Sequence, residues 1–178
     1  MENNPIPQKT IRVAEPGDTV LLADLAARAF TGAFSKVNTP QDMATYLVDS
    51  FSPQKLAAEL ALPGSLFLIL EADLEPVGYA RLLAGSSETC ITGARRVELV
   101  RFYLLQAWTG QRLGDLLMQA CIDQARGGGA DVIWLGVWQE NSRAIAFYQR
   151  WGFVEVGTQT FLLGQDIQSD YIMARRLG

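Results

Sequence analysis

The segment TGQRLGD at residues 109–115 has the residue types of an anion-binding loop. It follows an apolar stretch and leads into an amphipathic stretch of helical spacing, so unpaired backbone N–H groups would gather at the helix start. The positive end of the helix dipole lies at the same place, and together these groups favour an anion, most naturally a pyrophosphate. Glycine pairs at helix starts also serve turns and packing, so this loop needs support from other residues.

The elements that would position this loop form an α/β pattern. Residues 97–105 predict the strand that feeds the loop, and Leu113, Leu116, Leu117, Ala120 and Cys121 give the helix after it one apolar face. Three glycines end that helix, the first of them, Gly127, as a left-handed cap. A buried strand follows at 131–138, and then a helix at about 142–151, capped by Asn141 and ended by Gly152. Final strands are expected at about 153–163 and 171–177.

The first third of the chain is predicted to be mostly helical. Residues 1–9 form a polar tail with two prolines, and a short strand is expected near 10–14. Asp18 would cap the first helix, while Thr39-Pro40 and Ser52-Pro53 would open two more. Residues 66–70 and 77–83 predict a β-hairpin. The 178 residues are expected to form one domain.

Composition excludes several classes of function. The 15 basic and 19 acidic residues give a net charge of −4, which provides no basic surface for nucleic acid. An acidic surface would attract a cationic substrate, although mild acidity is also usual in soluble proteins. With no histidine and only Cys90 and Cys121, a metal site is not expected. No apolar run is long enough for a membrane span, and no signal peptide is present, so we expect a cytoplasmic protein with no membrane partner.

Two segments taken together resemble the cofactor motifs of the GCN5-related N-acetyltransferase (GNAT) superfamily. They are VELVRFYLLQAWTGQRLGDLL and, further on, IWLGVWQENSRAIAFYQRWGF. The resemblance implies the GNAT fold, with a mixed twisted sheet of about six to seven strands and about four to five helices. It also implies an acyltransferase that uses acetyl-CoA as cosubstrate, without a metal.

A closer resemblance joins AFTGAFSKVNTPQDMATYLVDSF and the tail GTQTFLLGQDIQSDYIMARRL to PaiA-type acetyltransferases. That branch is associated with acetylation of spermidine and spermine and, in bacilli, with regulation of protease production and sporulation. It implies a polyamine, or a similar primary amine, as the acceptor.

The resemblance assigns the cofactor to three parts of the chain. Backbone amides of Phe102, Tyr103 and Leu104 would receive the pantetheine arm as an added strand. Asn141 would hydrogen-bond the same arm, although it also fits a plain helix cap. The pyrophosphate would lie on the loop formed by Thr109, Gly110, Gln111, Arg112, Leu113, Gly114 and Asp115.

Two residues depart from the family's loop pattern. Thr109 stands where glutamine or arginine is preferred, and Arg112 stands in a glycine position. The Arg112 guanidinium would bind a phosphate oxygen, or else it simply faces solvent.

Two residues are the candidates for the chemistry. Glu98 lies eleven residues before Thr109, where histone-acetylating relatives have a glutamate base, and its structural alternative is an ion pair with Arg96 or Arg101. Tyr148 matches the family tyrosine that protonates or hydrogen-bonds the departing thiolate, and its structural alternative is a core tyrosine.

The acceptor side is less defined. Phe30, Phe34, Tyr46 and Phe51 would wall an acceptor channel or pack in the core, and Asp42 or Asp49 would hold a second ammonium group of a polyamine. A protein N-terminal or small-amine acetyltransferase and a non-catalytic CoA-binding regulatory module are the alternatives for the function. A homodimer is the default for a small enzyme.

Overall fold

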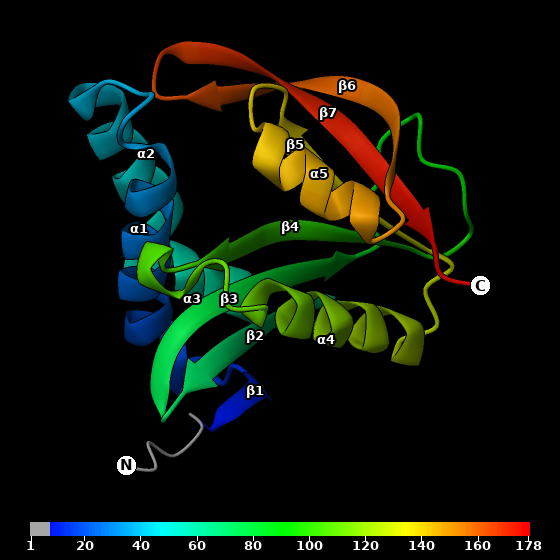
Figure 1. Ribbon diagram of the computed structural model, residues 1–178, viewed down its shortest axis with the longest axis horizontal. Coiled ribbons are helices and arrows are strands. Elements are labelled where there is room, and N and C mark those ends of the chain that lie inside the picture. The colour runs from blue at the N-terminus through cyan, green and yellow to red at the C-terminus, as the bar shows by residue number, and fades with distance from the viewer. Residues whose placement is uncertain (1–7) are drawn as a thin grey trace, which may run out of the picture.

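The structure is a computed structural model, and it describes residues 8–178. One mixed sheet of seven strands has the order β1-β2-β3-β4-β5-β7-β6, and five α-helices lie around it (Figure 1). The strands are β1 Lys9–Val13, β2 Ser65–Ala72, β3 Glu75–Ala84, β4 Arg96–Leu104, β5 Val132–Trp138, β6 Val154–Leu163 and β7 Asp166–Arg176. The α-helices are α1 Thr19–Phe34, α2 Pro40–Phe51, α3 Pro53–Ala61, α4 Leu113–Gly127 and α5 Ser142–Arg150. The predicted mixed α/β fold class is confirmed.

The helix starts agree with the sequence signals except at α1. Thr39 caps α2, because its hydroxyl accepts a hydrogen bond from the Asp42 backbone N–H at 3.1 Å. Asp18 occupies the N-cap position of α1 as predicted, but its side chain makes no capping hydrogen bond, so that part of the prediction is wrong. Its carboxylate instead binds the Arg12 guanidinium at 2.7 Å and the Glu15 backbone N–H at 2.8 Å, and the ion pair fixes β1 to the start of the helical region.

Two element ends were also misplaced. β7 begins at Asp166, five residues before the predicted start at Tyr171. The left-handed residue after α4 is Gly129, with φ 77°, and not Gly127, which still belongs to the helix. The predicted tail at 1–9 falls mostly outside the described residues, and Lys9 already belongs to β1.

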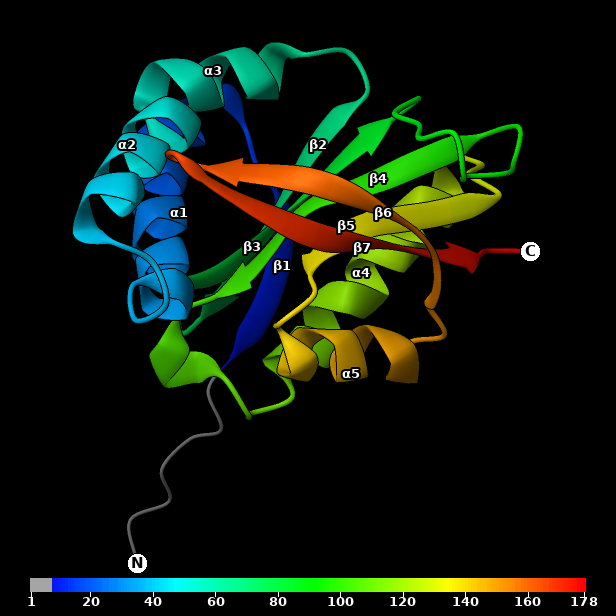
Figure 2. The same cartoon turned by 90° about the horizontal axis from the view of Figure 1, so that it is seen from above.

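The helices cover the two faces of the sheet. α1, α2 and α3 stand together and pack their buried leucines and Phe30 against Phe67, Ile69 and Tyr79 of β2 and β3. α4 packs Leu117, Met118 and Cys121 against the opposite face. Figure 2 shows α5 on the same side of the sheet as α4, below β5, β6 and β7 in that view. Within residues 8–178, no helix is both long and apolar enough to span a bilayer.

Candidate active site

The strands β4 and β5 separate after a short parallel contact. Only Arg96–Glu98 pair with Val132–Trp134 across this junction. Beyond it, β4 pairs with β3 alone and β5 pairs with β7 alone. The backbone of β4 from Leu99 onward therefore has an unpaired edge toward β5, where an extended ligand can bind as an added strand.

A β-bulge in β4 lies at the point of separation. Arg81 of β3 pairs with Arg101, whereas the next residue, Leu82, pairs with Leu99, so Val100 is the extra residue. Side chains of a regular strand alternate between faces, but here Leu99 and Phe102 both pack on the α4 side. The bulge thus turns Arg101 and Tyr103 toward the face covered by α1 to α3.

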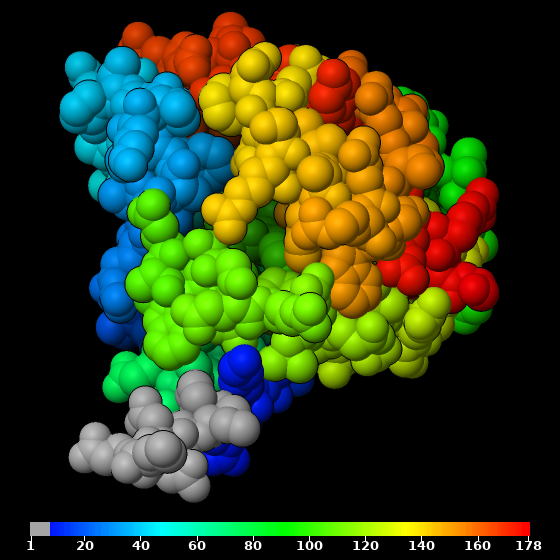
Figure 3. Space-filling view, in the orientation of Figure 1, coloured from blue at the N-terminus to red at the C-terminus, as the bar shows by residue number. Residues whose placement is uncertain are grey.

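The gap between the two strands opens into a cavity of about 1000 Å³. Its wall combines β4 and β5 with the starts of α4 and α5, the end of α1, and parts of α2, β6 and β7. Figure 3 shows the surface hollowed between α5 and the start of α4. The cavity is large enough for two small ligands to meet inside the protein.

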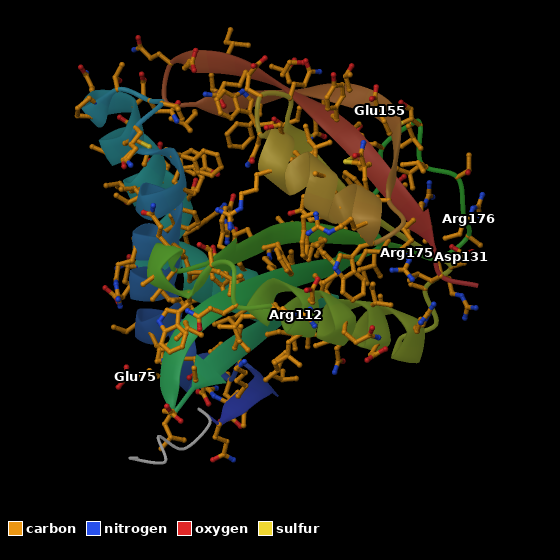
Figure 4. All side chains as sticks on the ribbon, viewed as in Figure 1. Glu75, Arg112, Asp131, Glu155, Arg175 and Arg176 are labelled. Carbon is orange, nitrogen blue, oxygen red and sulfur yellow. The ribbon has the colours of Figure 1, made fainter. Side chains whose placement is uncertain are left out.

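The start of α4 forms one end of this cavity. Gly110 and Arg112 both have left-handed backbones, with φ of 81° and 61°. Arg112 is the N-cap residue, and its side chain makes no capping hydrogen bond, so the first N–H groups of α4 are left for a ligand. Its exposed side chain lies at the start of the helix (Figure 4). The family pattern has glycine here for a physical reason, because a left-handed residue with a Cβ is strained.

Most of the predicted cofactor residues meet in this cavity. Those that line it are Phe102, Tyr103, Leu104, Thr109, Gly110, Arg112, Gly114, Asp115 and Asn141. The Gln111 side chain turns away and donates to the Ala107 carbonyl at 3.1 Å, and Leu113 is buried in the core. Only the backbone of these two residues is placed for a ligand.

Close packing joins the start of α4 to the second half of α5. A Cβ added to Gly114 would lie 3.4 Å from the Phe147 ring, at van der Waals contact, so the two helices approach closely at this glycine. The Asp115 carboxylate accepts a hydrogen bond from the Trp151 indole at 3.0 Å. Asn141 caps α5, because its side-chain oxygen accepts from the Ala144 N–H at 3.2 Å.

Tyr148 lies on α5 at the middle of the cavity wall. Its ring packs edge-on against Phe153 and Phe102, with centroids at 5.8 and 6.3 Å. Burial raises the pKa of the phenol, so the hydroxyl stays protonated and can donate a hydrogen bond. From the sequence, Tyr148 was expected either to pack in the core or to reach the cofactor. The structure combines the two positions, since the residue is buried and also lines the cavity.

Glu98 lines the cavity where β4 and β5 part. Its carboxylate accepts a short hydrogen bond from the Ser86 hydroxyl, and burial raises its pKa while Ser86 and Arg81 partly oppose that shift. The ion pair with Arg96 or Arg101, considered from the sequence, is not formed within residues 8–178.

Arg101 belongs to a separate buried group of charges. Its guanidinium binds both carboxylate oxygens of Glu59, which also meets Arg81 at 3.1 Å. These three side chains fix α3 to β3 and β4. Among residues 8–178, the Glu98 carboxylate is therefore left with Ser86 as its hydrogen-bond partner, and it lines the cavity.

Asp170 is a cavity residue that the sequence interpretation missed. It lies on β7 opposite Trp138 and Gln159, it is 7% exposed, and burial raises its pKa to about 6. A signal was present, because strand alternation puts it on the same face as Ile172, where a carboxylate is unexpected.

The two aspartates suggested for the acceptor side do not line the cavity. Asp42 accepts a hydrogen bond from the Gln165 backbone N–H at 2.9 Å and ties α2 to the turn between β6 and β7. Asp49 is exposed on α2. Of the four predicted aromatic residues, Phe30, Phe34 and Tyr46 line the cavity and Phe51 is a core residue.

Two further arginines were not singled out from the sequence. Arg143 and Arg150 of α5 line the same cavity, seven residues apart and hence on one side of the helix. With Arg112 they add positive charge to the cavity wall. The seven-residue spacing in the sequence already indicated that these two arginines lie on one side of the predicted helix.

Comparison with known proteins gives consistent matches. The model of the family described as "Acetyltransferase (GNAT) family" matches residues 24–153. An uncharacterized N-acetyltransferase of Lactobacillus delbrueckii subsp. lactis is 31% identical over 169 residues, covering 95% of this chain and 97% of that protein.

Among solved structures, the PaiA N-acetyltransferase from Thermoplasma acidophilum, in complex with coenzyme A, has a TM-score of 0.76 and 21% identity, covering 95% of this chain and 99% of that one. The ribosomal-protein-S18-alanine N-acetyltransferase from Escherichia coli has a TM-score of 0.70 and 20% identity, covering 96% and 94%.

Proposed function

Because the chain belongs to the acetyltransferase (GNAT) family and is an N-acetyltransferase, we propose that it transfers the acetyl group of acetyl-CoA to a primary amine. The observation that supports this most is the cavity through the gap between β4 and β5, since it joins an anion-binding helix start to Glu98 and Tyr148. A structural neighbour with coenzyme A bound adds support.

The residues present fit the cosubstrate. The free N–H groups at the start of α4 would receive the pyrophosphate, and Arg112, Arg143 and Arg150 would neutralise phosphate charge. The backbones of Phe102, Tyr103 and Leu104 would hydrogen-bond the pantetheine arm, and Asn141 at the start of α5 would add a further hydrogen bond.

The chemical step needs one proton acceptor and one proton donor. Glu98 would take a proton from the acceptor ammonium, directly or through one water, so that the amine lone pair is free to attack the thioester carbonyl. As the C–S bond breaks, Tyr148 would donate a hydrogen bond or its proton to the departing thiolate. The products are then an amide and a thiol.

For the acceptor, we propose a small cationic amine such as the polyamines that the PaiA-type resemblance implies. Two of the carboxylates that line the cavity, Glu98 and Asp170, support this choice. The alternative is a protein N-terminus, which is favoured by the likeness to an enzyme named for the S18 alanine. The cytoplasmic location, the homodimer and the single domain stay predictions.

The test of the proposed function is an acetyl-CoA consumption assay. Spermidine, spermine, single amino acids and N-terminal peptides are offered as acceptors to the purified protein. Turnover of the small amines, with weak or no turnover of peptides, is the expected result. Turnover of peptides alone would instead support a protein N-terminus as the acceptor. No turnover of any amine would refute the proposed acetyl transfer.

Replacing Arg112 separates its backbone strain from its charge. Arg112→Gly should raise the free energy of unfolding by about 1 kcal/mol, because glycine adopts the left-handed backbone without strain, and it should weaken CoA binding several-fold. Arg112→Ala should weaken CoA binding equally without the gain in stability, since it keeps the Cβ. Denaturant unfolding and CoA titration measure both effects. Unchanged CoA affinity in both variants would mean that the guanidinium only faces solvent.

A further inference from the structure

Asp170 has no charged partner among the residues that the structure describes. None of the salt bridges among residues 8–178 includes it, although it is one of the few charged side chains that are buried. A buried carboxylate without a cation is costly, and a cationic ligand in the cavity would supply the missing charge. Asp170 lines the cavity, which gives this carboxylate access to a ligand.

The absence of a side chain at Gly136 exposes this carboxylate to the cavity. A Cβ added to Gly136 would lie 3.3 Å from the Asp170 Oδ2 atom and would collide with the Gln159 amide. Gly136, Gln159 and Asp170 all line the cavity, from the neighbouring strands β5, β6 and β7. The Gln159 and Asp170 side chains therefore occupy the space that a side chain at residue 136 would take, and both residues line the cavity.

Aromatic rings enclose the same part of the cavity. Tyr46 of α2 and Phe161 of β6 pack with their centroids 5.6 Å apart, and both line the cavity with Trp138. Trp138 is also the β5 residue paired with Asp170. One carboxylate among aromatic faces suits an ammonium group, because ring faces attract a cation and the carboxylate neutralises it.

This place differs from the one where acetyl transfer would occur. Tyr148 packs on the face of the sheet covered by α4, whereas Asp170 alternates with Tyr171 and Met173, which pack on that face, and so points to the other face. Along β5, Gly136 lies two residues beyond Trp134, the partner of Glu98, which is about 7 Å of strand. A short diamine spans such a separation.

We infer that Asp170, with Gln159 and the rings of Tyr46 and Phe161, forms a subsite for a second ammonium group of the acceptor, remote from the amine that is acetylated. The inference rests on the proposed function for the identity of the reacting end. It assigns Asp170 to binding and selectivity, and it leaves the proton transfer to Glu98.

The test compares diaminobutane with butylamine as acceptors. The wild-type protein should have a KM for the diamine at least about tenfold below that for the monoamine. Asp170→Asn should remove this difference by raising the KM of the diamine, with kcat for both amines within about twofold of wild type. Asp49→Asn is the matched control, because it removes an exposed carboxylate outside the cavity and should change nothing.

Two results would overturn the inference. One is equal KM values for the two amines in the wild type, and the other is a loss of kcat for both amines in Asp170→Asn, which would place Asp170 at the reacting amine. If neither amine is acetylated, that result speaks against the proposed acetyl transfer and leaves the subsite to a separate measurement. Calorimetric titration of diaminobutane into the protein with CoA is that measurement. Binding that Asp170→Asn abolishes supports the subsite, and binding that is absent or unchanged contradicts it.

Discussion

Tyr148→Phe is expected to lower kcat at least about tenfold while leaving CoA affinity within about twofold of wild type. Tyr148 lines the cavity and its hydroxyl stays protonated, so the substitution removes the proposed donor for the departing thiolate and keeps the ring. The ring contacts with Phe102, Phe147 and Phe153 are kept by phenylalanine. Steady-state kinetics and CoA titration measure the two quantities.

Tyr171→Phe is the matched control for that experiment. Tyr171 packs against the same core cluster from β7 but does not line the cavity, so the same loss of one hydroxyl should leave kcat unchanged. Equal activity of Tyr148→Phe and wild type would contradict the role given to the phenol. A fall in CoA affinity with kcat unchanged would instead give Tyr148 a binding role.

The parts of the site that the sequence predicted are those formed by local chain geometry. Gly110, the start of α4 and the Asn141 cap each depend on residues within one turn of one another, and they lie as expected. The departure from the family pattern at Arg112 also has a local explanation, because the left-handed backbone at this position accounts for the glycine of the pattern.

The parts that were missed depend on strand register. The bulge at Val100 decides which face Arg101 and Tyr103 occupy, and no local pattern in β4 marks it. Asp170 reaches the cavity because β7 inserts between β5 and β6, and because Gly136 two strand positions away lacks a side chain. Such pairings join residues of different strands, as Arg81 is paired with Arg101 and Trp138 with Asp170, so the hydrophobic periodicity of one segment does not contain them.

The acceptor-side positions suggested for Asp42 and Asp49 were wrong for the same reason, because they depend on contacts between distant parts of the chain. Asp42 and Asp49 are close in sequence to Tyr46, which suggested that they face the acceptor. One of them is used to hold the turn after β6, and the other faces solvent. Asp170 is the carboxylate that lines the cavity together with Tyr46, and it lies near the C-terminal end of the sequence.

Glu98→Gln is expected to lower kcat/KM about a hundredfold at neutral pH, because it removes the proposed proton acceptor. The pH profile gives a sharper measurement. Burial raises the pKa of Glu98, so the activity of the wild type should rise with pH through a range above that of an ordinary glutamate. The variant should lose this acidic limb of the profile. Glu155→Gln, an exposed glutamate on β6 outside the cavity, is the control.

Stability distinguishes a lost base from a damaged fold. A carboxyl whose pKa is raised by folding binds protons more tightly in the folded state than in the unfolded state. The protein therefore loses stability as pH rises between the unfolded and folded pKa values of Glu98. Glu98→Gln removes that cost, so above this range the variant should be at least as stable as wild type in thermal unfolding. A variant that is inactive and also less stable, or one that keeps the acidic limb, would exclude Glu98 as the base.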